Sequence, residues 1–280
     1  MRIADKRRLI YEENEIMDLK QFVANENEKP LDSFSLNGGF CTIFRKIGAV
    51  GDSLSSGEFE VLKEDGTKEY HDCFDFSWGQ FMARICGSQV TNFSRGGMTA
   101  KEFCESFADK YGYFDADKAC AAYIIALGCN DIFGLKMPIG SINDVNFEDC
   151  RSHPDNFAGW YGELVLRYKE ISPDAKFFFV TLPREDKSEE EQKRVDDHQK
   201  LLYDMAEAFG NSYVIDLRRY AVPYDAGFKE KFFLHGHLNP AGYKLTAEMF
   251  VSYIDWIIRN NPKDFEKAGF IKAQYNRTIL

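Results

Sequence analysis

Short apolar runs recur along this chain and alternate with longer stretches of helical periodicity. The runs are of strand length and continuous, which is typical of strands buried on both faces of a parallel sheet. Five of them stand out: residues 43–50, 89–93, 122–127, 176–182 and 213–217. Because strands that alternate with helices build parallel sheets covered on both faces, the pattern predicts an α/β fold with about five parallel strands.

The stretches between these runs carry helix signals. Ser188 and Glu191 fit a capping box, and Asn239 followed by Pro240 fits the cap and first position of another helix. Helices are predicted over residues 76–85, 157–168, 188–209 and 240–258. Together with the strands they predict three layers, flavodoxin-like, with the sheet in the middle.

No linker rich in proline, glycine or serine divides the chain. We therefore expect one domain over residues 41–280, with residues 1–40, which are polar and charged, as an N-terminal extension packed on it. In a parallel sheet of this kind the ligand site lies at the carboxyl ends of the strands. Candidate functional residues are those that follow a predicted strand.

The chain is acidic, with a formal net charge of -10. Because such a surface repels phosphate backbones and anionic lipids, neither nucleic acid nor a membrane is an expected partner. The N-terminal region has no apolar stretch long enough for a secretory signal, so the expected location is cytoplasmic. The seven cysteines are scattered and form no CxxC pair, which favours free thiols over disulfides or a zinc site.

Two segments that follow strands carry candidate chemistry. Ser53, within Gly-Asp-Ser-Leu, follows the first strand, so its hydroxyl would stand at the sheet edge and its amide at a helix start. The alternative role for Ser53 is that of a simple helix cap. Gly96 and Gly97 follow the second strand and would let a ligand approach a peptide N–H, although an ordinary turn has the same sequence.

Two more segments carry candidate catalytic residues. Asn130 follows the third strand and can offer a side-chain amide donor, and His237 precedes the last helix, where it can act as a general base. Each signal alone also fits ordinary loop chemistry. Together they provide the nucleophile, base and oxyanion donors that acyl transfer needs.

In combination these segments resemble the conserved blocks of the SGNH hydrolases, also called GDSL esterases and lipases, over roughly residues 43–258. The Gly-Asp-Ser-Leu sequence around Ser53 is similar to the family signature, and Gly97, Asn130 and His237 match the later blocks. The resemblance implies an SGNH hydrolase fold with Ser53 as nucleophile and His237 as base. It also implies an oxyanion hole formed by the amides of Ser53 and Gly97 and the side chain of Asn130.

One position departs from the family pattern. The family usually places an aspartate three residues before the histidine, and here that residue is Leu234, which cannot orient an imidazole. The sequence leaves open what holds His237. The candidates are a backbone carbonyl, a carboxylate such as Asp225 or Glu230, and the neighbouring His235.

Further residues near the predicted site are candidate substrate contacts. Asp52, Arg95 and His235 lie beside the catalytic candidates, and an arginine there can recognise a carboxylate or a sugar hydroxyl. Tyr70 and Trp78 could form a platform for a sugar, although Trp78 fits better as an anchor of a helix on the sheet.

Other reactive residue types fit plainer roles. His71 and Asp72 resemble metal-ligand spacing but fit a solvated loop, so no metal site is expected. His153 fits a turn, and His198 fits a charged helix face. Cys129, inside the third block, fits a small space-filling side chain better than a reactive thiol.

These features predict a serine esterase that hydrolyses carboxylic esters through an acyl-serine intermediate, without a metal or cofactor. Its expected partner is a small-molecule or oligosaccharide ester, and by family resemblance the leading activity is carbohydrate O-acetyl esterase. Two alternatives remain open. One is a non-catalytic carbohydrate- or ester-binding descendant, and the other is a thioesterase or acyltransferase on acyl-CoA, which would need a basic patch for the phosphates.

Overall fold

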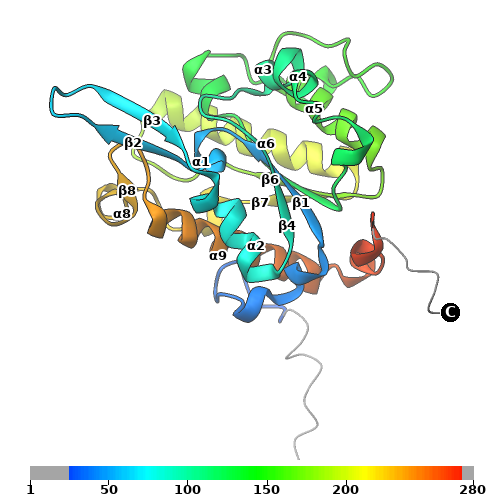
Figure 1. Cartoon of the computed structure of the whole chain (residues 1–280). Coiled ribbons are helices and arrows are strands. Elements are labelled where there is room, and N and C mark those ends of the chain that lie inside the picture. The colour runs from blue at the N-terminus through cyan, green and yellow to red at the C-terminus, as the bar shows by residue number, and fades with distance from the viewer. Residues whose placement is uncertain (1–24, 273–280) are drawn as a thin grey trace, which may run out of the picture.

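A five-stranded parallel sheet forms the centre of the molecule (Figure 1). The computed structural model describes residues 25–272. The strands lie in the order β4 (Gln89–Ser94), β1 (Lys46–Gly51), β5 (Ala122–Ala126), β6 (Lys176–Val180) and β7 (Ser212–Ile215), and neighbours are parallel. All five predicted strands are confirmed, and their order is that of flavodoxin-like sheets.

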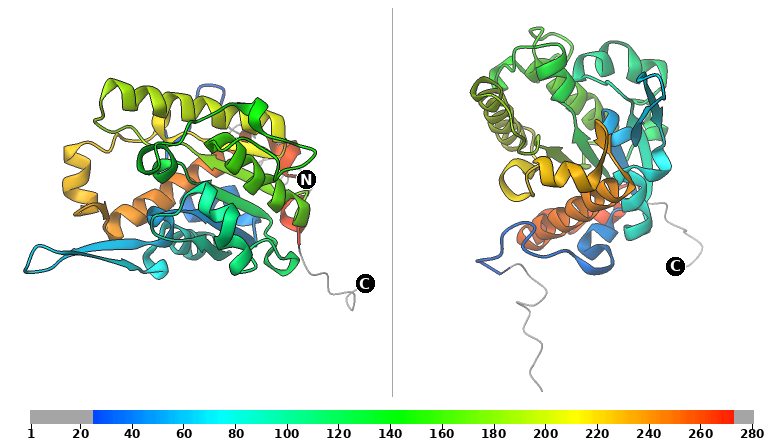
Figure 2. Two further views of the ribbon diagram at one scale, coloured as in Figure 1. Left: turned by 90° about the horizontal axis from the view of Figure 1, so that it is seen from above. Right: turned by 90° about the vertical axis from the view of Figure 1, so that its left-hand side faces the viewer.

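Helices cover both faces of the sheet (Figure 2). On one face lie α2 (Trp78–Cys86) and α9 (Pro240–Asn260), and on the other α5 (Phe157–Ile171) and α6 (Glu189–Phe209). None of the helices within residues 25–272 is long and apolar enough to cross a membrane. The shorter helical elements are α1 (Ser53–Ser56), α3 (Ala100–Glu102), α4 (Ala108–Lys110), α7 (Leu217–Tyr220), α8 (Ala226–Phe232), the π-helical segments η4 (Phe103–Phe107) and η6 (Asn130–Gly134), and the 3₁₀ segments η2 (Leu36–Ile43), η3 (Phe74–Phe76), η5 (Ala116–Lys118), η7 (Ile142–Asp144), η8 (Pro262–Phe265) and η9 (Ala268–Phe270).

Strand β6 shows why the predicted strands are continuous apolar runs. Phe177 and Phe179 pack in the core under α5 and α6, whereas Phe178 packs in the core under α2 and α9. Successive side chains of a strand point to opposite faces. A strand between two helical layers must therefore be apolar at nearly every position.

The capping residues predicted from the sequence lie at the starts of the two longest helices. Ser188 and Glu191 form the capping box of α6, each side chain accepting from the other residue's backbone N–H. Asn239 caps α9, with Pro240 in its first turn. Helix α2 begins later than predicted, directly after its own cap, Ser77.

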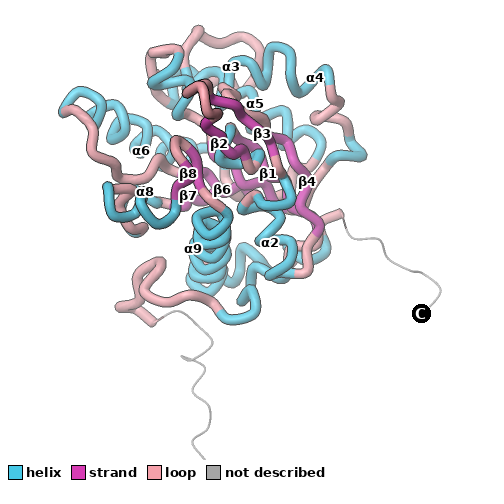
Figure 3. Tube along the Cα trace, turned by 60° about the vertical axis from the view of Figure 1, so that its left-hand side comes forward, coloured by secondary structure: helices cyan, strands magenta, loops and turns pink. Residues whose placement is uncertain are grey.

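Two antiparallel hairpins were not predicted. Strands β2 (Glu58–Leu62) and β3 (Lys68–Asp72) form a hairpin that projects from the body of the molecule (Figure 1). Strands β8 (Phe233–Leu234) and β9 (His237–Leu238) form a shorter one, and Figure 3 shows β2 and β8 side by side. Because β2 and β3 are half polar and largely exposed, they lack the apolar run that identified the sheet strands.

The described part of the predicted extension lies against α9. The Glu28 carboxylate lies 2.7 Å from the Arg259 guanidinium, and the amide of Phe40 donates to Asp255 at 2.7 Å. Residues 1–24 of that predicted extension lie outside the described residues.

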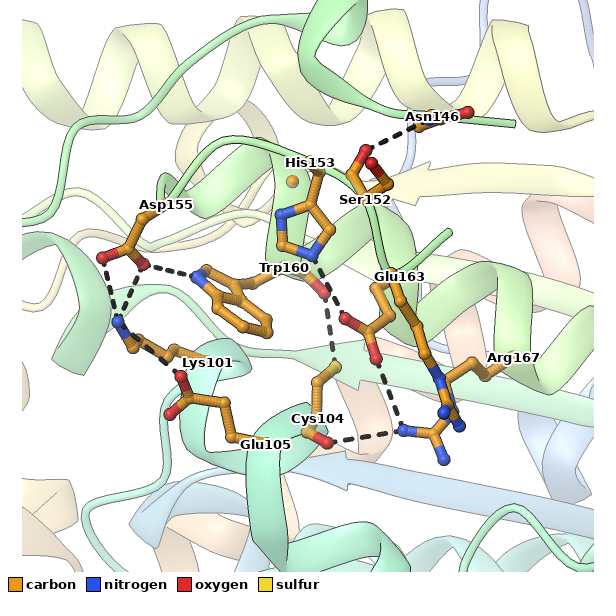
Figure 4. Close-up of polar contacts among 12 residues, drawn as sticks. Lys101, Cys104, Glu105, Asn146, Ser152, His153, Asp155, Trp160, Glu163 and Arg167 are labelled. Atoms are coloured by element: carbon orange, nitrogen blue, oxygen red, sulfur yellow. Dashed lines mark hydrogen bonds and ion pairs between the residues drawn. The ribbon is translucent and has the colours of Figure 1, made fainter. Parts of the chain in front are cut away.

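Two histidines are more deeply buried than their sequence context predicts. His198 was predicted on a charged helix face, but it is fully buried and packs against Phe157, because it shares the inward face of α6 with Leu202. His153 was predicted in a turn, and its ring is buried beside α5 (Figure 4). Its Nε2 lies 3.1 Å from the Glu163 carboxylate, so the ring belongs to a buried polar cluster.

Candidate active site

Strand β1 leads directly into the segment predicted to hold the nucleophile. Asp52 caps α1 by accepting the Leu54 amide at 3.1 Å, and Ser53 is the first residue of that helix. Gly51 is required before them, because a Cβ there would overlap the Ser55 side chain. Burial raises the pKa of Asp52 to about 7. Ser53 thus stands at the carboxyl edge of the sheet, where the sequence predicts it.

The second and third predicted blocks are bonded to each other. Asn130 Nδ2 donates to the Met98 carbonyl at 3.1 Å, and Asp131 accepts the Ala100 amide at 2.9 Å. Gly97, in the same turn as Met98, has φ of 71°, a backbone conformation that favours glycine. These bonds hold the turn that contains Gly97 against the segment that contains Asn130.

His237 opens strand β9 and faces two carboxylates. Its Nε2 lies 3.1 Å from Glu58 Oε1, and its Nδ1 lies 3.8 Å from Glu60 Oε2. Burial lowers the pKa of His237, and the charge of Glu60 opposes that shift. Because the pKa lies below its ordinary value, the imidazole is mostly neutral at pH 7 and can accept a proton.

Ser53, Asn130 and His237 line a single cleft of about 310 Å³. Gly97, the remaining predicted oxyanion donor, lies outside this lining. The cleft follows the carboxyl edge of the sheet towards α8 and α9. Much of its lining is apolar, including Leu54, Trp78, Leu127, Phe133, Val180, Leu182, Leu217, Phe233 and Phe250.

The cleft lining carries little net charge. Its acidic and basic side chains are those of Asp52, Glu185, Lys187 and His237. Lys187 lies 2.8 Å from Glu185, so its charge is already balanced. A cleft of this kind suits a neutral ligand better than one that carries phosphates. Within residues 25–272 no group of three or more His, Cys, Asp or Glu side chains is arranged to hold a metal ion.

The predicted substrate contacts occupy different places. Asp52 lines the cleft beside Ser53. Arg95 lies 2.7 Å from the Glu102 carboxylate, with its guanidinium over the ring of Phe107. His235 is exposed in the turn of the β8–β9 hairpin, at φ of 58°.

The two carboxylates proposed from the sequence to orient His237 lie elsewhere in the fold. Asp225 caps α8 by accepting the Phe228 amide at 2.9 Å, and Glu230 is exposed on that helix. The carboxylates beside His237 are those of Glu58 and Glu60 on β2, which sequence reasoning missed. The available signal was the polar alternation of residues 58–60 just after the nucleophile segment.

One protein-family model matches most of the sequence. Residues 49–245 match the model of the GDSL-like Lipase/Acylhydrolase family, a span that runs from β1 into α9. The chain belongs to this family. The matched span of this GDSL-like protein contains Ser53, Gly97, Asn130 and His237, and the predicted family membership is confirmed.

Solved structures share the fold of this GDSL-like protein. A family two carbohydrate esterase from Clostridium thermocellum in complex with cellohexaose matches with a TM-score of 0.54 and 16% identity, over 79% of this chain and 65% of that chain. A carbohydrate esterase family 2 enzyme from Corynascus thermopiles (Myceliophthora fergusii) matches with a TM-score of 0.52 and 14% identity, over 75% of this chain and 65% of that chain. Likeness at these identities establishes the fold alone. No curated protein has a significant sequence match.

Proposed function

We propose that this GDSL-like protein is a serine ester hydrolase, with Ser53 as nucleophile and His237 as general base. One observation carries the proposal. Ser53, Asn130 and His237 come from three distant segments of the chain and line the same cleft. Acyl transfer needs a nucleophile, a base and an oxyanion donor at one place.

The proposed reaction has two halves. Ser53 Oγ attacks the ester carbonyl carbon while His237 takes the hydroxyl proton, and the resulting tetrahedral intermediate expels the alcohol, which leaves with that proton. Water then attacks the acyl-serine by the same route, releasing the acid and restoring Ser53. The amides of Ser53 and Gly97 and the side chain of Asn130 are the proposed oxyanion donors. Asn130 Nδ2 has two hydrogens and gives one to Met98, so the other remains for this role.

An acetylated sugar or oligosaccharide is the substrate class we propose first. The ring of Tyr70 is 51% exposed and meets the His237 ring edge-on at 5.8 Å, so it offers a face on which a sugar can pack. Glu58 and the nearby Asp72 can accept hydrogen bonds from sugar hydroxyls. Trp78 is buried and packs on Phe250, so it is not available as a second platform.

A longer acyl ester is the second candidate, and the apolar part of the cleft favours it. An acetyl group fills a small fraction of a cleft of about 310 Å³. A hydrocarbon chain that packs on apolar side chains such as Leu54, Val180 and Leu217 would bury apolar surface, which favours binding. A thioesterase or acyltransferase acting on acyl-CoA lacks comparable support, because Lys187 in the cleft is paired with Glu185.

Removal of the nucleophile tests the proposed chemistry. Ser53→Ala should lower kcat on p-nitrophenyl acetate at least about 10³-fold, because it removes the hydroxyl proposed to form the acyl-enzyme. Ser106→Ala, at an exposed position of η4 outside the cleft, is the matched control and should keep wild-type kcat. Full activity in Ser53→Ala would exclude this nucleophile. Ligand binding without turnover in the wild type would instead identify a non-catalytic binding protein.

A substrate panel separates the two substrate candidates. We expect a higher kcat/KM on acetylated xylo- or cello-oligosaccharides than on p-nitrophenyl octanoate. The reverse order would overturn the carbohydrate O-acetyl esterase proposal and favour an acyl chain bound in the apolar part of the cleft.

A further inference from the structure

The histidine of this site lacks the orienting residue at its usual place. Leu234 is 40% exposed and is paired with His237 across the β8–β9 hairpin. An aliphatic side chain accepts no hydrogen bond, so it cannot select the tautomer of the imidazole. The β2–β3 hairpin is therefore the structural element to consider.

Strand alternation places several polar side chains of that hairpin on one face. Glu60 is opposite Tyr70 and Glu58 is opposite Asp72 in the antiparallel register. Since residues two apart share a face of a strand, these four side chains lie on the same side. That side faces His237, as the distances from its ring to Glu58, Glu60 and Tyr70 show.

The two glutamates are held differently. Glu60 is buried, lies 2.7 Å from Lys68 Nζ, and accepts a bond from the Gly236 amide. A Cβ at Gly236 would overlap its carboxylate, so the chain leaves a space for it. Lys68 lowers the pKa of Glu60, which keeps the group ionised. Glu58 instead lies against Gly96 in the second block, and burial raises its pKa.

The positions of the glutamates also distinguish the two ring nitrogens. Nε2 lies next to the Glu58 carboxylate. The Tyr243 hydroxyl bonds the backbone carbonyls of both Glu58 and Ser53, so the glutamate nearest Nε2 is the one whose backbone lies beside the nucleophile segment. Nδ1 is buried, has no hydrogen-bond partner within the described residues, and faces Glu60.

We propose that Glu60 is the positioning residue of His237, taking the part that an aspartate at position 234 would otherwise have. Its carboxylate holds Nδ1–H, which leaves Nε2 free to take the proton of Ser53. The 3.8 Å separation closes by a small side-chain rotation, as catalytic hydrogen bonds are often long without substrate. Glu58, whose Oε1 lies 3.1 Å from Nε2, is displaced by the incoming ester. This inference rests on the proposed function.

Glu60→Gln tests the assignment. We expect kcat on p-nitrophenyl acetate to fall about 10²- to 10⁴-fold. The pKa of His237 should also fall, since removal of a nearby anion destabilises the imidazolium, and the acid limb of the pH–rate profile should move to lower pH. Glu60→Asp, which keeps the charge, should restore the pKa and part of the rate. The groups that face His237 and must be unchanged in these variants are Glu58, Lys68, Tyr70 and Asp72.

Glu69→Gln is the matched control, because Glu69 lies on the opposite face of the same hairpin and pairs with Lys63. It should change neither kcat nor the His237 pKa. Titration of His237 followed by NMR needs no turnover, so it tests the contact even if no ester is hydrolysed and the proposed function fails. An unchanged His237 pKa in Glu60→Gln, or the same effects in Glu58→Gln instead, would overturn the role of Glu60.

Discussion

At the scale of single residues, Asp52 links the candidate site to stability. It is buried at the end of β1, where it caps α1, and burial raises its pKa to about 7, well above the value of about 3.9 expected for an unfolded chain. Asp131 lies nearby, and burial raises its pKa to about 6. Both carboxyl groups therefore hold their protons to higher pH than a free aspartate does.

The raised pKa of Asp52 makes the stability of the fold depend on pH in a definite direction. Because the folded state holds the proton of Asp52 more tightly, its contribution to stability is complete below pH 4 and is lost as the pH rises to about 7. Asp52→Asn keeps a capping side chain but cannot ionise. It should stabilise the protein by about 2 kcal/mol at pH 8 and change little at pH 4, measured by thermal unfolding.

The control for this prediction is Asp225→Asn, which makes the same change at the exposed cap of α8. It should alter stability by less than about 0.5 kcal/mol at either pH. Equal effects of the two substitutions would contradict a raised pKa at Asp52.

At the scale of elements, α5 is held in place by a buried polar cluster as well as by its apolar face. Glu163 lies between the buried side chains of His153 and Arg167, and Figure 4 shows these contacts between α5, η4 and the segment before α5. Arg167 also bonds the Cys104 carbonyl and the Asp109 carboxylate. The cluster thus joins α5 to the helices that cover β4 and β5.

Loss of the Glu163 carboxylate from this cluster should lower the stability of the fold. Glu163→Ala leaves Arg167 and His153 buried without one partner, so it should destabilise the fold by about 3 kcal/mol in denaturant-induced unfolding. Glu170→Ala, exposed on the same helix, should cost less than about 1 kcal/mol. A similar small cost for both would mean that water replaces the partner in this cluster.

At the scale of the whole molecule, the sheet separates two apolar cores. Phe178 belongs to the core under α2 and α9, where its ring packs edge-on against that of Phe44 at 5.9 Å. The sheet carries the candidate site at its carboxyl edge, so the position of that edge depends on both cores.

Truncation of Phe178 tests the importance of this packing. Phe178→Ala should destabilise the protein by about 3–5 kcal/mol, since it removes a fully buried ring and leaves a cavity. Phe34→Ala, at a ring that is 52% exposed, should cost about 1 kcal/mol or less in the same urea titration. A small effect of Phe178→Ala would require the surrounding core to collapse into the space.

Local sequence determined the sheet and the long helices of this protein. The apolar runs 89–93 and 122–127 predicted strands because a strand buried on both faces must be apolar throughout. The capping residues Ser188 and Asn239 marked helix starts because their side chains bond amides only three residues away. Ser53 and Asn130 could likewise be identified because each directly follows such a strand.

Tertiary structure decided what surrounds His237. Glu58 and Glu60 are about 180 residues away in the chain, and they reach the ring through a hairpin whose polar strands have no apolar run to reveal them. The burial of His198 was also missed, since its charged neighbours conceal that it shares a face with Leu202. Local sequence encodes contacts a few residues apart, whereas a contact between distant segments depends on how the whole chain packs.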